Sequence, residues 1–296
     1  MKRVLTLYII LWSSVCFAQS ANELFEPTVE EGYRLYKAEM AAWHGSDLFN
    51  AKNTEKITPG GYVAYPDGEK ETVCVFFDKE DSDVVIFEVT FDEDFTLETA
   101  DIEFKERKAT RKEKKLFSMR SMTIDQFQSD TLFKFYQNTS PNIIPISDEL
   151  GERVYVLTGP QQSGVILFGN DYLLTFDDDL NHVNTEALHK SLIAVFTNEE
   201  DVKKHIHTHL PDKNPFMTAT DLCTILLYSK YCEIESFSVI SEKYLSWWDR
   251  SSGKPFAMTR EALDKIERSQ DSLKTVRDSI RINTPVNSPD STSEAP

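Results

Sequence analysis

Apolar and polar positions follow two different periods along the first half of the chain. From Val29 to Trp43, apolar or aromatic residues recur at intervals of three and four, which predicts an amphipathic helix with Gly45 as its stop. Residues 59–135 instead hold short β-branched and aromatic runs separated by PDG and DKEDSD, which are typical of turns. The pattern therefore predicts a helix followed by an antiparallel β-meander.

The second half of the chain mixes both periods. Three short strands are expected within residues 152–176, and a helix is expected over TEALHKSLIAVF, residues 185–196. HIHTH, residues 205–209, has the alternation of a strand, and TDLCTILLYSKYC, residues 220–232, has the spacing of a helix. These elements predict an α+β fold.

The expected domain boundary lies in SPNIIP, residues 140–145, because it carries two prolines. We therefore expect a helix-plus-meander domain at 22–139 and a second α/β/α domain at 146–258. Residues 259–296 begin as a charged helix and end in a polar, proline- and serine-rich tail that is typical of disorder.

The first eighteen residues are typical of a secretory signal peptide. Lys2 and Arg3 are followed by an apolar run from Val4 to Phe17 and then by Ala18, after which we expect cleavage. No later stretch is apolar enough to span a bilayer. We therefore expect an exported protein, periplasmic or secreted, with no transmembrane segment once the signal is removed.

Charge and cysteine content narrow the expected partners. The formal net charge is −17, which repels phosphate backbones, so no nucleic-acid partner is expected. The basic run KERKATRKEKK, residues 105–115, could bind an anionic polysaccharide, although a solvated face is the favoured interpretation. Beyond the signal, Cys74, Cys223 and Cys232 show no disulfide spacing, and we expect buried free thiols.

The alternating histidines are the strongest sign of chemistry. In a strand, His205, His207 and His209 all project to one face, where two imidazoles can bind one metal ion. Asp221, in the first turn of the following helix, could supply a third ligand. The opposing interpretation is a solvent-exposed strand, with Asp221 as an ordinary residue of a helix N-terminus.

This arrangement resembles the JAMM (JAB1/MPN) metallopeptidase-like fold, whose signature is H-x-H-P, a loop, and S-x-x-D opening a helix. The matching residues are His207-Thr208-His209-Leu210-Pro211 and Thr218-Ala219-Thr220-Asp221, within a region of about 148–250. The resemblance implies zinc as cofactor, ligated by His207, His209 and Asp221, with Thr218 at the serine position that helps to orient the oxyanion. Because Pro211 comes one residue late and the loop is one residue longer, His205 and His207 remain an alternative pair.

The resemblance also implies a glutamate that acts as general base. Glu152, in ERVYVLTG, is the first candidate for that role, and Glu149 and Glu39 are alternatives. An active enzyme would then generate hydroxide at zinc and cleave an amide bond in a peptide or a cell-wall crosslink. The alternative is a non-catalytic envelope protein that binds an envelope protein, a peptide or a polysaccharide.

The whole chain also resembles exported proteins of unassigned activity from Bacteroidetes. The stretches that carry this resemblance are GYRLYKAEMAAWHGSDLF and FGNDYLLTFDDDLN. It implies a location outside the cytoplasm and no particular activity.

Overall fold

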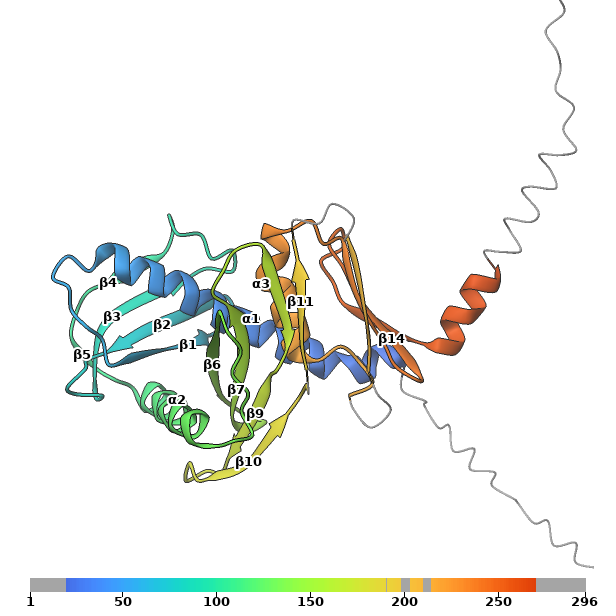
Figure 1. Ribbon diagram of the computed structural model, residues 1–296. Helices are drawn as coiled ribbons and strands as arrows, with labels where there is room; N and C mark the ends of the chain where they lie inside the picture. Colours follow the sequence, from blue (N-terminus) through green and yellow to red (C-terminus); the bar gives the residue numbers. More distant parts are fainter. Residues whose placement is uncertain (1–19, 190, 198–202, 210–213, 270–296) are drawn as a thin grey trace, which may run out of the picture.

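The computed structural model describes residues 20–189, 191–197, 203–209 and 214–269 (Figure 1). The predicted signal peptide at 1–18 and most of the predicted polar tail lie outside the described residues. The described part is α+β, which confirms the predicted fold class. Among the described residues, no helix is both long and apolar enough to cross a bilayer.

The N-terminal helix is longer than its apolar spacing predicted. α1 runs Ala21–Lys52 and begins with a capping box between Ser20 and Glu23. It continues through Gly45, so the predicted stop is wrong. A Cβ atom at Gly45 would lie 2.9 Å from Cβ and Sγ of Cys74. Glycine is therefore used here for close helix-to-sheet approach, because any side chain would clash.

The predicted antiparallel meander is confirmed. Its strands pair in the order β1-β2-β3-β4, with β5 also on β3, and they are β1 (Gly61–Asp67), β2 (Glu71–Phe77), β3 (Val84–Phe91), β4 (Asp101–Glu103) and β5 (Arg107–Lys108). The basic run then enters α2 (Arg111–Ser129), which Thr110 and Glu113 cap reciprocally. Residues 111–135 of the region expected to be meander are therefore helix and turn.

A second antiparallel sheet contains the segment predicted as a boundary. Its order is β10-β9-β7-β6, from β6 (Thr139–Asp148), β7 (Gly151–Pro160), β9 (Tyr172–Phe176) and β10 (His182–Ala187). Residues 140–145 lie inside β6, where they pair with β7. Because β6 is at the edge of this sheet, Pro141 and Pro145 can be accommodated without breaking a ladder on both sides.

The helix predicted over residues 185–196 is wrong. Its start belongs to β10, and its end is β11 (Leu192–Phe196), which pairs antiparallel with β8 (Val165–Gly169). A short apolar run has no periodicity that separates helix from strand, and pairing with β8 decides in favour of the strand.

The C-terminal sheet carries the histidine motif. β12 (Lys204–Thr208) and α3 (Ala219–Tyr228) each begin one residue before the predicted strand and helix and confirm both. After η1 (Ser229–Tyr231), the chain forms β13 (Ser236–Ile240), β14 (Tyr244–Asp249) and β15 (Phe256–Thr259), in the sheet order β12-β13-β14-β15. β12 and β13 are parallel and α3 lies between them in sequence, so this part is a βαβ unit. Residues 260–269 are helical.

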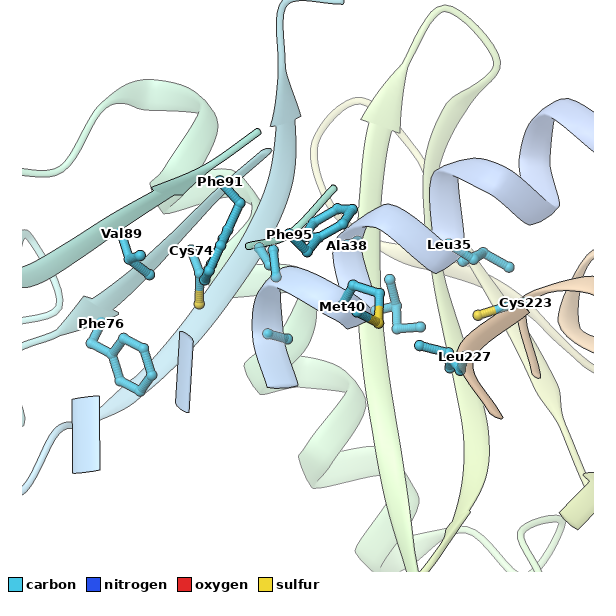
Figure 2. Close-up of a cluster of buried hydrophobic side chains, with 14 of the residues drawn as sticks. Leu35, Ala38, Met40, Cys74, Phe76, Val89, Phe91, Phe95, Cys223 and Leu227 are labelled. Carbon is cyan, nitrogen blue, oxygen red and sulfur yellow. The ribbon is translucent and has the colours of Figure 1, made fainter. Parts of the chain in front are cut away.

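α1 contributes to a buried core that the meander, the second sheet and α3 share. One cluster of buried side chains includes Leu35 of α1, Phe91 of β3, Tyr155 of β7 and Cys223 of α3. Figure 2 shows Leu35, Ala38 and Met40 of α1 between the meander and α3. Cys74, Cys223 and Cys232 are buried and free, which confirms the expectation from their spacing.

Candidate metal centre

Three potential ligands meet where β12 ends and α3 begins. His209 directly follows β12, and its backbone N–H donates to the carbonyl of Ile240 at 2.9 Å. Asp221 is the third residue of α3, whose N-terminus is capped by Thr218. His189 comes from the connection between β10 and β11. The carboxyl end of a strand followed by a helix N-terminus is a common place for binding sites in α/β units.

The ligand atoms of His189, His209 and Asp221 all lie within 4.8 Å of one another. Asp221 Oδ2 is 3.5 Å from His189 Nε2 and 4.0 Å from His209 Nε2. Tetrahedral zinc bonds of about 2.0–2.2 Å would space such atoms by about 3.3–3.6 Å. The cluster is therefore slightly wider than a filled site, and side-chain adjustments of about 1 Å would close it.

The hydrogen bonds of both imidazoles direct Nε2 to the cluster. His189 Nδ1 is 3.2 Å from Oδ2 of buried Asp171, and His209 Nδ1 is 2.9 Å from the backbone carbonyl of Asn214. Both partners are acceptors, so each Nδ1 carries the proton that it donates. Metal-binding histidines are typically held in this way by a carboxylate or a carbonyl.

Asp221 is held in place by the residue that caps α3, Thr218. Its Oδ2 accepts hydrogen bonds from the Thr218 N–H at 3.0 Å and the Thr218 hydroxyl at 2.8 Å. Burial raises the pKa of this carboxyl, but His189 and the Thr218 hydrogen bonds outweigh it and lower the pKa well below its ordinary value. Thr218 thus positions the carboxylate and is not itself one of the three ligands.

The cluster is built to hold positive charge. Burial lowers the pKa of His189, but the carboxylates of Asp221 and Asp171 outweigh burial and raise that pKa to about 10. Without a metal, a proton on His189 supplies the positive charge. A metal cation at the same place would displace that proton, since histidine ligands bind metals in the neutral form.

Two ligand atoms of the cluster lack hydrogen bonds. Within the described part of the chain, His189 Nε2 and Asp221 Oδ1 are buried and have no hydrogen-bond partner. Such atoms are costly unless another group, such as a metal ion, satisfies them. Two imidazole nitrogens and one carboxylate oxygen also match the donor set of three-ligand zinc sites. The residues present therefore fit zinc.

The cluster contains two of the three ligands predicted from sequence. His209 and Asp221 are members, whereas His207 is not among the three residues that meet. The His207 ring instead packs edge-on against Phe237 and Phe168, with ring centroids 4.8 Å and 5.5 Å away. Burial lowers the pKa of His207, although Asp221 partly opposes this. His205 lies on β12 two residues before His207.

His189 was missed because it fell inside the wrongly predicted helix. Interpreting residues 192–196 as a strand would have placed His189 in the loop before that strand, where it could be considered as a ligand. Asp171, which holds the His189 ring, begins the DYLLTF strand and had no distinguishing motif.

None of the three glutamates considered as general base joins the cluster. Glu152 lies on β7 and forms an ion pair with Lys115 of α2. Side chains alternate along a strand, so Glu152 shares the α2-facing side with Val154, whereas Tyr155 packs on the side of α1. Glu149 is exposed at the β6–β7 turn. Glu39 lines a different pocket.

A pocket of about 520 Å³ opens beside the cluster. Its lining includes Thr218, which hydrogen-bonds to Asp221, and Asn214, whose carbonyl faces His209. Leu188, the chain neighbour of His189, also lines it. Glu31 and Arg153 line the same pocket and form an ion pair at 2.7 Å. The cluster therefore borders a hollow with both apolar and charged walls that is large enough for part of a peptide or another small molecule.

Comparisons with protein-family models, with curated proteins and with solved structures find no match for this chain.

Proposed function

We propose that the chain is an exported zinc-binding protein whose ligands are His189 Nε2, His209 Nε2 and a carboxylate oxygen of Asp221. The observation that carries the proposal is that ligand atoms of His189, His209 and Asp221, from three separate parts of the chain, lie within 4.8 Å of one another. Within the described residues, Asp221 Oδ1 is buried without a hydrogen bond, and His189 Nε2 faces only the Asp221 carboxylate, at 3.5 Å. The charge of the cluster and the two Nδ1 hydrogen bonds support the same conclusion. The order of ligands, with His209 after a strand and Asp221 in the first turn of the next helix, also supports the JAMM-like resemblance. In this version of the resemblance, His189 takes the place that the motif gives to His207.

Three protein ligands favour a catalytic role over a structural one. Structural zinc sites usually have four protein ligands, whereas catalytic sites keep one position for water. A zinc ion held by these residues would supply Lewis-acid chemistry and would activate water for hydrolysis of an amide bond. In this chain, Thr218 fixes Asp221, Asp171 fixes His189, and the pocket with Glu31 and Arg153 would receive the substrate.

The second candidate function is a non-catalytic envelope protein that uses the same fold to bind a partner. Its support is that the predicted base, Glu152, is paired with Lys115 rather than directed at the cluster. The two functions differ in whether zinc-loaded protein hydrolyses peptide amides. Both require the same metal analysis as a first step.

Elemental analysis of protein purified without a histidine tag tests the ligand set. We expect about one zinc per chain, and we expect H189A, H209A and D221N each to lose it. The matched control is H182A, because His182 is an exposed histidine of β10 whose ring contacts Thr185 and Phe176 and not the cluster. Circular dichroism of each variant separates loss of a ligand from loss of the fold.

The variant H207A separates the structural ligand set from the one predicted by sequence. We expect H207A to retain zinc, because its ring packs on Phe168 and Phe237. If H207A lost zinc and H189A retained it, the ligands would instead be the motif-derived set of His207, His209 and Asp221. Negligible zinc in the unmodified protein would contradict the proposed function altogether.

A further inference from the structure

A second pocket, of about 660 Å³, shares no lining residue with the one beside the metal centre. It lies between α1, β1 and the end of α3. Glu39 and Trp43, one helical turn apart on α1, line it together with Tyr62 of β1, Tyr228 of α3 and Tyr231 of η1. One carboxyl and four aromatic rings thus surround a single cavity.

Two of these rings are unusually exposed for their size. Trp43 is 37% exposed and Tyr231 is 60% exposed. The Trp43 ring centroid lies 5.7 Å from that of Tyr231 and 6.2 Å from that of Tyr228. Exposed aromatic side chains clustered at a pocket are typical of binding sites. Burying them would stabilise the fold, so their exposure indicates that they serve a ligand.

The Glu39 carboxyl has no cation paired with it. Within the described ranges, it forms no hydrogen bond and no ion pair. Burial raises its pKa to about 7, partly opposed by the charge of Arg120. Arg120 lies near enough for its charge to act on Glu39, but its guanidinium is placed 4.4 Å over the Tyr62 ring, and among the described residues it forms no ion pair with the Glu39 carboxylate. A carboxylate that is desolvated and unpaired gains most from a bound positive charge.

We propose that this pocket binds a small organic cation, with its ammonium group against Glu39 and its apolar part against the cluster formed by Trp43, Tyr228 and Tyr231. Aromatic faces attract ammonium groups, and the attraction grows when the cation is desolvated. The carboxylate disfavours anions, and a neutral ligand would leave it unpaired. This inference is independent of zinc, because the two pockets do not overlap.

Choline is a suitable probe, and dimethylbutanol is its neutral carbon isostere. Saturation-transfer NMR at pH 8, where Glu39 is mostly charged, should show saturable choline binding to the full chain. We expect the isostere to bind about tenfold more weakly or worse, because only the charge differs. The variant E39Q should weaken choline binding by a similar factor. W43L, which keeps an apolar side chain, should weaken it about threefold to tenfold.

The matched control is E30Q, which removes an exposed carboxyl from the same helix and the same formal charge. Choline should bind to E30Q as it binds to the unmodified protein. If E30Q and E39Q weakened choline binding equally, the effect would come from the overall charge of the protein, and the proposed binding site would be wrong. Absence of saturable choline binding would also overturn the proposal. So would saturation by a lysine-containing peptide in place of choline, because the occupant would then be a protein side chain.

Discussion

The two histidines of the candidate metal centre are oriented by acceptors of different charge. Asp171 is a buried carboxylate, whereas the partner of His209 is a backbone carbonyl. A backbone carbonyl can be lost only by moving the chain, but a carboxylate can be changed by one substitution. Asp171 is therefore the position at which the orientation of a proposed ligand can be tested without touching the ligand itself.

The variant D171N should weaken zinc binding by about tenfold to a hundredfold. An asparagine amide can donate to His189 Nδ1, which would favour the tautomer that carries a proton on Nε2 and blocks the ligand lone pair. Competition with a chromophoric chelator measures the affinity. D178N is the matched control, because Asp178 is an exposed aspartate in the turn after β9. Equal affinities in D171N and D178N would show that Asp171 does not position His189.

Glu39 should make stability depend on pH in the direction opposite to that of most carboxyl groups. Its pKa in the folded chain is about 7, raised by burial from an ordinary 4.5 and lowered only partly by Arg120. The carboxyl therefore contributes stability that is fully present below pH 4.5 and is lost as the pH rises through 7. The loss should not exceed about 3 kcal/mol. The groups that interact with Glu39 are Arg120 of α2, Tyr62 of β1, Cys74 of β2, and Cys223 and Tyr228 of α3.

Urea unfolding at pH 5 and pH 8 measures this effect. Between these two conditions, the unmodified protein should lose about 1–3 kcal/mol more than E39Q, because the amide does not titrate. E30Q should follow the unmodified protein. A parallel pH dependence of E39Q and the unmodified protein would mean that Glu39 titrates near its ordinary pKa.

At the scale of elements, the sequence predicted those helices and strands whose formation depends on the local spacing of apolar residues. The meander, β12 and α3 were predictable because alternation and helical spacing extend over whole elements. His209 and Asp221 were predictable for the same reason, since a strand end and a helix N-terminus are both visible in the sequence. Residues 185–196 were not, because an apolar run of five residues becomes a strand only through pairing with β8.

The third ligand required long-range information. His189 lies 20 residues before His209 in the sequence, and no spacing rule connects the two. Likewise, the face of β7 that carries Glu152 depends on which helix covers which side of the sheet. Alternation tells which residues share a face, but it does not tell that α2 covers one face and α1 the other.

The close contact between α1 and α3 can be tested with a single substitution. A Cβ atom at Gly32 of α1 would lie 2.7 Å from Cδ2 and 2.9 Å from Cβ of Leu222, which is fully buried beside Asp221. G32A should therefore lower the free energy of unfolding by about 1–2 kcal/mol. The cost of overpacking, about 1–3 kcal/mol, exceeds the stabilisation of up to about 1 kcal/mol that alanine gives a helix relative to glycine.

The same substitution should also weaken zinc binding, because it moves the first turn of α3. Urea unfolding and chelator competition measure the two effects. E30A is the control, since it places alanine at an exposed position of α1 and should change stability by less than about 0.5 kcal/mol. A neutral or stabilising G32A would show that α1 and α3 can separate without cost.

At the scale of the whole molecule, α1 belongs equally to both halves of the chain. The cluster that contains Cys74 of the meander also contains Cys223 of α3, and both side chains are fully buried. The predicted division at residues 140–145 would separate these two cysteines into different domains. A shared core instead couples their exposure, because neither half can open without removing the apolar surface that covers the other.

The thiols themselves report whether the halves unfold together. In protein that lacks the predicted signal peptide, and with it Cys16 and Trp12, we compare a variant that keeps only Cys74 with one that keeps only Cys223. Pulse labelling with a thiol reagent in increasing urea should give coincident midpoints for the two cysteines, and reductant should not change either midpoint, because the thiols are free. The midpoint of tryptophan fluorescence, which reports Trp43, Trp247 and Trp248, should coincide with both. Labelling of Cys74 at clearly lower urea than Cys223 would instead mean that the meander opens as an independent domain, and α1 would then have to detach from one of its two partners first.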